Sequence, residues 1–193
     1  WQYDLMLAWE TNTNAPTPIV EWMQSVMGTA LYDRLRDDGH EPVAYFDLLD
    51  GQNPAKGVAS QAYEPRYSTG YVPLRNRPSI LVESHMLKPN STRVLAQYHV
   101  LRRVLELASA NAATLRTATA RADAEDLDRG KSDTAPQPFV LSLKPSETPT
   151  PFTMKGVWYS VIPSEISGSD RIVYDNTKPK DIETSWFKTL VVD

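Results

Sequence analysis

Two titratable side chains that could carry chemistry stand close together in the middle of the chain. Glu83 ends the apolar run Ser79 to Val82, and His85 follows the glutamate by two residues. A carboxylate can take a proton from an attacking water and later deliver it to a leaving group, which is general acid–base catalysis. A histidine two positions further along a strand shares a face with the glutamate and can orient it by hydrogen bonding. Glu83 is therefore a candidate for proton transfer, and His85 is a candidate for its support.

A structural role for Glu83 is the alternative. Three cations, Arg75, Arg77 and Lys88, lie within a few positions of the glutamate and could pair with it at the end of a strand. A general base must face an open cleft, because burying its charge without a partner would cost several kcal/mol. The two interpretations therefore differ in whether a cation holds the carboxylate.

No metal site is expected from this chain. His40, His85 and His99 occur in no His-x-x-Glu or His-x-x-x-His arrangement. We expect His40 to be solvated at a helix end and His99 to have a surface or half-buried position on a helix. Cysteine is absent, which excludes disulfides, thiolate metal sites and a cysteine nucleophile. Ser164 and Ser167 lack the Gly-x-Ser-x-Gly frame of serine hydrolases.

Composition narrows the class of protein and of partner. The 193 residues are 41% hydrophobic and 23% charged, which is typical of a globular protein, and the net charge is -4. The charges form no basic stripe, so nucleic acid is not an expected partner. The longest apolar run is far shorter than the roughly 18 residues of a membrane helix, so no membrane span is expected. Because the chain opens on the aromatic Trp1, we expect it to be a piece of a longer protein.

The candidate base needs a strand to position it. The run from Pro78 to Glu83 predicts a strand buried on both faces, with the glutamate at its C-terminal end. In open α/β sheets ligands bind at that edge. Residues 1–9 alternate loosely and predict a second strand, and the run from Val43 to Leu49 predicts a third. The residues from Asp50 to Arg77 show no periodicity and predict a long loop, a common place for binding groups.

Two helices are predicted from the spacing of apolar residues between and after these strands. Apolar residues recur from Ile19 to Leu35 after a proline-rich entry, and Gly39 ends the pattern. A second helix is predicted to start near Ser91 and to run to Ala124, with a bend between Ser109 and Asn111. The fold class is therefore α/β over residues 1–126.

Beyond this region the character of the sequence changes. Leu127 to Pro138 has the composition of a linker, and residues 139–193 predict a separable, small β-rich domain. Its β-prone runs are Phe139 to Leu143, Phe152 to Val161, Arg171 to Tyr174 and Trp186 to Val192.

The segment around the glutamate resembles a known family. It reads Arg75-Asn-Arg-Pro-Ser-Ile-Leu-Val-Glu-Ser-His-Met-Leu-Lys-Pro, with Ser68-Thr-Gly-Tyr upstream. This pattern is similar to the STGY, RNRP and ETHMLKP elements of a bacterial branch of the carboxypeptidase A-like zinc peptidases, and the likeness covers residues 1 to about 110. Ser84 stands where that branch has threonine, and Asn90 where it has tyrosine.

The resemblance implies a mixed eight-stranded sheet between helices, of which this chain would supply the C-terminal portion. It implies that Glu83 is the general base of a zinc peptidase that removes C-terminal residues from a peptide substrate. The zinc ligands, a His-x-x-Glu pair and a distant histidine, would belong to the upstream half of the same peptidase. The opening Trp1-Gln-Tyr-Asp is similar to the residues that follow this histidine. The intact parent would bind zinc, and this chain would not.

The resemblance also assigns two residues of the long loop. A mobile loop at this place supplies a tyrosine that closes over the substrate, so Tyr71 and the neighbouring Arg66 become candidate substrate-binding residues. Two other functions stay open: a non-catalytic binding or scaffolding domain, and a related deacylase that hydrolyses amides. A His-x-x-Glu pair and a histidine encoded just upstream of Trp1 would favour the peptidase over both.

Overall fold

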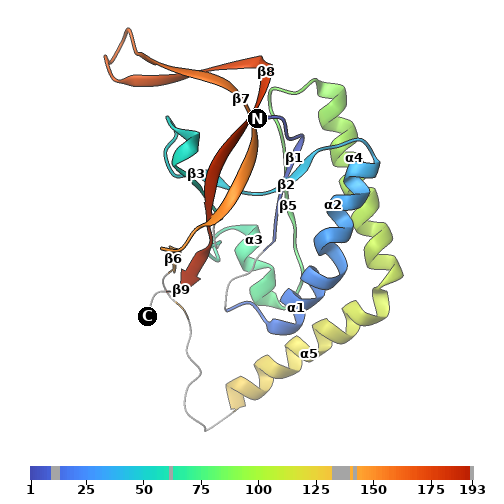
Figure 1. Ribbon diagram of the computed structural model, residues 1–193. Coiled ribbons are helices and arrows are strands. Elements are labelled where there is room, and N and C mark those ends of the chain that lie inside the picture. Colours follow the sequence, from blue (N-terminus) through green and yellow to red (C-terminus); the bar gives the residue numbers. More distant parts are fainter. Residues whose placement is uncertain (10–13, 61–62, 132–139, 141–142, 192–193) are drawn as a thin grey trace. The chain divides into compact units, whose positions relative to one another are not determined.

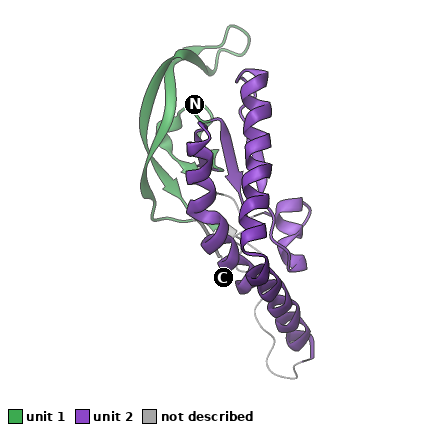
Figure 2. Ribbon diagram, turned by 90° about the vertical axis from the view of Figure 1, so that its right-hand side faces the viewer, with its two compact units in different colours: residues 1–3, 45–61, 143–190 green, residues 4–44, 62–142, 191–193 purple. Residues whose placement is uncertain are grey.

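The protein is mixed α/β. The computed structural model describes residues 1–9, 14–60, 63–131, 140 and 143–191 (Figure 1). The chain divides into two compact units, which Figure 2 shows in different colours. Unit 1 is drawn from Trp1–Tyr3, Tyr45–Gln61 and Leu143–Leu190, and unit 2 from Asp4–Ala44 and Ala62–Ser142 together with the last three residues. Each unit is therefore assembled from distant parts of the sequence.

Unit 2 contains a three-stranded mixed sheet in the order β2-β1-β5. The central strand β1 (Leu5–Ala8) runs parallel to β2 (Pro42–Ala44) and antiparallel to β5 (Leu81–Ser84). The predicted strand in residues 1–9 is thus confirmed for its second half. The predicted strand from Val43 to Leu49 is instead split, because β2 ends at Ala44 and the next strand belongs to unit 1.

The helices of unit 2 follow the predicted apolar spacing. Helix α1 (Thr17–Trp22) begins with a proline in its first turn, continues through a π-helical segment, η1 (Met23–Met27), and leads into α2 (Gly28–Asp37). Gly39 then adopts a φ of 86°, a left-handed conformation that favours glycine and ends the helix, as predicted. Leu5 and Leu7 of β1 pack against these helices in one apolar core.

The second helical region breaks where the sequence predicted a bend. Helix α4 (Asn90–Ala110) ends at Asn111, whose side-chain amide donates to the carbonyl of Leu107. Helix α5 (Ala112–Lys131) follows directly and runs beyond the predicted end at Ala124. Residues 127–131, predicted as the start of a linker, are therefore helical. Their leucine and charged residues are compatible with a helix; the rest of the predicted linker, 132–138, lies outside the described residues.

Unit 1 is built on a long β-hairpin. Strand β7 (Thr150–Pro163) pairs antiparallel with β8 (Asp170–Phe187), and two short strands, β3 (Asp47–Leu48) and β4 (Val58–Ala59), extend the sheet in the order β3-β4-β8-β7. A separate pair joins β6 (Leu143–Pro145) to β9 (Thr189–Val191). The runs predicted at Arg171 to Tyr174 and at Trp186 belong to one continuous strand, β8.

The β-rich unit is larger than the predicted domain of residues 139–193. Strand β4 lies in the stretch predicted as a loop, and it pairs in parallel with β8 through Val58 and Trp186. Phe46 is 3% exposed and packs edge-on against the rings of Trp1, Tyr3, Phe152 and Trp186. Phe46 and β4 are thus part of the core of unit 1, through long-range contacts that local sequence patterns do not reveal.

Candidate functional site

Glu83 lies one residue before the end of strand β5, at the C-terminal position that the sequence predicted. Its register partner on β1 is Met6, and its own side chain is exposed. The prediction of a strand buried on both faces is wrong: in the sheet of unit 2, β5 is an edge strand whose residues are half-buried or exposed. A strand of four residues that pairs on one side only is more accessible to solvent than a central strand would be.

Two of the three cations that could pair with Glu83 bind other carboxylates. Arg77 contacts Asp123 of α5 at 3.1 Å, and Lys88 contacts Asp4 at 3.0 Å. Within the described part of the chain, the carboxylate of Glu83 makes no hydrogen bond or ion pair. The structure therefore does not support the pairing that a structural role for Glu83 would require.

His85 is held in the turn that follows β5. Its backbone N–H donates to the carbonyl of Asp4, and its Nδ1 accepts a hydrogen bond from the backbone N–H of Leu87 at 3.1 Å. This second bond requires the proton of the neutral ring to lie on Nε2. Burial lowers the pKa of His85, and the ammonium of Lys88 acts in the same direction. The imidazole is therefore neutral at pH 7 and orders the turn directly after the candidate base.

Tyr71 and Arg66 lie on and before the short helix α3 (Ser68–Tyr71). Tyr71 is 53% exposed. Arg66 pairs with Glu64 at 2.7 Å and places its guanidinium 4.8 Å from the ring centroid of Tyr67. In the described residues, no hydrogen bond or ion pair connects either of them with Glu83. The structure thus leaves both side chains accessible without joining them to the candidate base.

The loop that carries Tyr71 is more ordered than the sequence predicted. It contains α3 and two 3₁₀ turns, η2 (Pro54–Lys56) and η3 (Pro73–Arg75). Gly70 packs so closely on the backbone of Tyr63 and Glu64 that a Cβ at this position would clash with their carbonyl oxygens. The segment before β5 therefore has a defined shape, which depends on a residue without a side chain.

An apolar groove lies on the face of β5 opposite to Glu83. Its volume is 240 Å³. Its lining includes Val82 of β5, Ile80 directly before this strand, and Val100, Leu101 and Val104 of α4. Neighbouring residues of a strand point to opposite faces, so the groove at Val82 is not a cleft in front of the Glu83 carboxylate. The predicted open cleft at Glu83 stays a prediction.

Helix α4 presents apolar side chains to solvent as well as to the core. Four of them recur at intervals of three or four residues and form what we call the α4 stripe: Val94, Tyr98, Leu101 and Leu105. Each is more than half exposed, from 57% for Tyr98 to 69% for Leu105. A continuous apolar stripe of this kind on a helix is typical of a contact with another protein surface.

His40 departs from its predicted solvated position, whereas His99 is half-buried on α4 as expected. His40 is only 9% exposed, and its Nε2 lies 2.8 Å from Nδ1 of His99. The turn after α2 thus places one imidazole against α4, where burial is the main cause that lowers the pKa of His40. The sequence signal was ambiguous, because a histidine after Gly39 at a helix end is more often solvated.

The described residues do not fit a zinc site. Over these residues no group of three or more histidine, cysteine, aspartate or glutamate side chains is placed to hold a metal ion. The His40 and His99 rings share a hydrogen bond and offer only two donors, fewer than the three protein ligands of a catalytic zinc.

Sequence reasoning missed a second candidate site, a pocket on the hairpin of unit 1 between β7 and β8. The signal was the Trp158-Tyr159 pair opposite a strand interrupted by Asp175-Asn-Thr-Lys-Pro. The first stretch was interpreted as strand alone, and the second lay between two predicted strands.

None of the helices in the described residues combines the length and apolar character that crossing a membrane requires. Comparison with protein-family models, with curated proteins and with solved structures finds no match to this chain.

Proposed function

We propose that this chain is the C-terminal half of a zinc peptidase of the carboxypeptidase A type, in which Glu83 is the general base. The observation that carries the proposal is the exposed carboxylate of Glu83 at the C-terminal end of a strand, while Arg77 and Lys88 bind other carboxylates. An unpaired carboxylate in this position is available to a substrate, whereas a structural one would be expected to hold a cation.

The role of Glu83 follows from its chemistry. Its carboxylate accepts a proton from the water that attacks the scissile carbonyl, and it returns a proton to the leaving amine. The neutral imidazole of His85 orders the turn after β5 through Leu87 and so helps to fix the end of the strand. Tyr71 and Arg66 are proposed to contact the peptide substrate from the preceding loop. Zinc would supply electrophilic assistance from ligands outside this chain.

The proposed partner of the chain is the upstream half of the same peptidase. Two features of unit 2 support it. Strand β5 is at the edge of its sheet and can accept a further strand, and the α4 stripe offers an apolar surface for a covering element. An upstream half that adds a strand beside β5 would place its own residues next to Glu83.

The sequence encoded directly upstream of Trp1 provides the first test. The proposal expects a histidine a few residues before Trp1 and a His-x-x-Glu pair further upstream. If an extended reading frame carries neither, the peptidase assignment is overturned and a binding or scaffolding role replaces it.

Substitution of Glu83 provides the second test, in the protein that contains both halves. Glu83→Gln keeps the size of the side chain and removes the proton acceptor, so turnover of a C-terminal peptide substrate should fall by about 100-fold or more. The KM and the zinc content should change little. Glu165→Gln, in the turn between β7 and β8, is the matched control and should keep full turnover. Normal turnover of the Glu83→Gln protein with its metal retained would exclude the general-base role.

A further inference from the structure

The hairpin of unit 1 contains a large irregularity halfway along its length. Val157 pairs with Pro179, whereas the next residue, Trp158, pairs with Asp175, so residues 176–178 of β8 have no partner on β7. Such a bulge interrupts the ladder and redirects the neighbouring side chains. Bulges of this kind are common beside binding sites.

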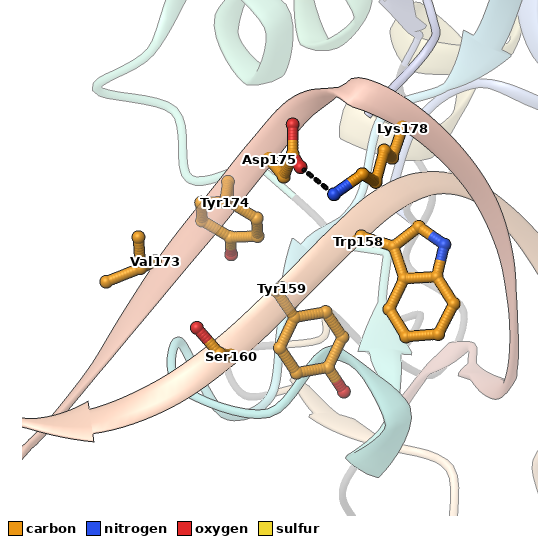
Figure 3. A pocket seen from close by; sticks show the side chains of 7 residues that line it. All are labelled: Trp158, Tyr159, Ser160, Val173, Tyr174, Asp175 and Lys178. Atoms are coloured by element: carbon orange, nitrogen blue, oxygen red, sulfur yellow. Dashed lines mark ion pairs between the residues drawn. The ribbon is translucent and has the colours of Figure 1, made fainter.

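The bulge borders a pocket with a volume of 550 Å³, shown in Figure 3. Strand β7 contributes Trp158, Tyr159 and Ser160, and β8 contributes Val173, Tyr174, Asp175 and Lys178. The volume lies in the range of sites for small ligands. Three aromatic residues and several residues with hydrogen-bonding groups therefore line this pocket.

The aromatic part of the pocket is exposed but held in place. Trp158 is 51% exposed and Tyr174 is 43% exposed. The ammonium of Lys180, which does not line the pocket, lies 4.2 Å from the ring centroid of Trp158. The Tyr159 and Tyr174 rings are 6.3 Å apart with an interplanar angle of 57°. These contacts restrain the rings, so a ligand that stacks on them would lose less entropy on binding.

The polar part of the pocket has hydrogen-bonding capacity left. Asp175 accepts from the backbone N–H and the hydroxyl of Thr177, and from the ammonium of Lys178 at 2.8 Å. A carboxylate has about four acceptor positions and an ammonium has three donors. One acceptor position of Asp175 and two donors of Lys178 are therefore available to a ligand, directly beside the aromatic rings.

We propose that this pocket binds a carbohydrate. A sugar ring offers apolar C–H faces that stack on aromatic rings, and hydroxyl groups that both donate to Asp175 and accept from Lys178. A proline-rich peptide also docks on aromatic grooves, but proline has no N–H to satisfy the carboxylate. Nucleic acid needs an excess of cations, whereas the lining has one acid and one base and the chain has a net charge of -4.

Titration of the intact chain with oligosaccharides tests the proposal. Cellotetraose and chitotetraose are the probes, and the readouts are tryptophan fluorescence and calorimetry. We expect binding of at least one of them. Trp158→Ala should weaken it about tenfold or more, in line with the contribution of one aromatic stacking contact, and Lys178→Met should weaken it several-fold through the loss of donors. Ile166→Ala, at the fully exposed tip of the same hairpin, is the matched control and should leave affinity unchanged.

Two outcomes would overturn the proposal. One is the absence of binding to both oligosaccharides at millimolar concentration, and a decaproline peptide that binds instead would assign the surface to peptides. The other is binding that Trp158→Ala and Lys178→Met leave intact. Trp158→Phe keeps an aromatic face and should retain most of the affinity, so it separates loss of stacking from loss of folding. The melting temperature of each variant verifies that the hairpin is intact.

Discussion

At the residue scale, the burial of His40 in unit 2 favours the neutral form of its imidazole. The His40 imidazole contacts His99 in a setting where burial, and then the neighbouring His99, lower its pKa, while Asp4 and Asp38 oppose the shift. The two rings share a hydrogen bond that requires at least one of them to be neutral. The stability of unit 2 should therefore depend on pH.

We predict that the free energy of unfolding falls as the pH drops from 7.5 to 5.5. The folded pKa of His40 lies below its ordinary value of 6.5, so in this range the unfolded chain binds more protons than the folded one. His85 is shifted in the same direction and adds to the effect. The contribution of the neutral histidines to the free energy of unfolding is fully present above about pH 6.5. It is lost as the pH falls toward their pKa values in the folded protein. The carboxylates whose pKa is lowered titrate at more acidic pH.

Urea unfolding at the two pH values measures this loss. His40→Gln keeps an amide that can donate to His99 but does not titrate, so its stability should change less with pH. His85→Gln is the parallel variant, and it removes only the contribution of His85 to the pH dependence. A wild-type stability that is flat across this range, or an unchanged slope in His40→Gln, would contradict the prediction.

At the element scale, one arginine connects two helices of unit 2. Arg103 of α4 binds both carboxylate oxygens of Asp38, the residue after α2, and also contacts Glu106 at 2.7 Å. Its side chain is 19% exposed and that of Asp38 is 12% exposed. The pair to Glu106 is local to α4, whereas the contact to Asp38 joins α4 to the end of α2.

Arg103→Met should therefore lower the melting temperature by several degrees, because it leaves Asp38 half-buried without its main partner. The matched control is Arg121→Met, which breaks an exposed pair with Glu125 four residues further along α5. A surface pair of this kind contributes little, so the control should shift the melting temperature by only about 1 °C. Equal effects of the two variants in a thermal melt would show that the Asp38 contact does not stabilise the protein.

At the scale of the whole molecule, each compact unit is built from segments that are not consecutive in the sequence. Strands β3 and β4 and the aromatic ring of Phe46 come from residues 45–59, although most of unit 1 lies after residue 142. The boundary predicted near residue 139 lies close to Leu143, where the last segment of unit 1 begins, but Trp1–Tyr3 and Tyr45–Gln61 also belong to that unit.

We predict that residues 139–193 do not fold when they are produced alone. Such a fragment lacks β4, which pairs with the end of β8, and Phe46, which packs on Phe152 and Trp186. In the intact chain, Phe46→Ala should lower the free energy of unfolding by about 3–5 kcal/mol, the usual cost of removing a buried phenylalanine. Dispersed amide signals in a proton–nitrogen NMR spectrum of the isolated fragment would contradict the prediction.

The sequence by itself determined the helices of unit 2, the end of the first helix at Gly39 and the break near Asn111. It also determined the position of Glu83 at the end of a strand. These features depend on apolar spacing, turn residues and glycine conformation, which act over a few neighbouring residues. The assignment of Glu83 as a catalytic base stays a proposal.

Only the tertiary structure decided which strands meet. It joined β4 and Phe46 to the hairpin, made β5 an edge strand, buried His40 against His99 and formed the aromatic pocket at the bulge opposite Trp158. Each of these features joins residues far apart in the sequence, or depends on the register between two strands. Pairing and register follow from packing across the whole unit, which no local pattern of residues specifies.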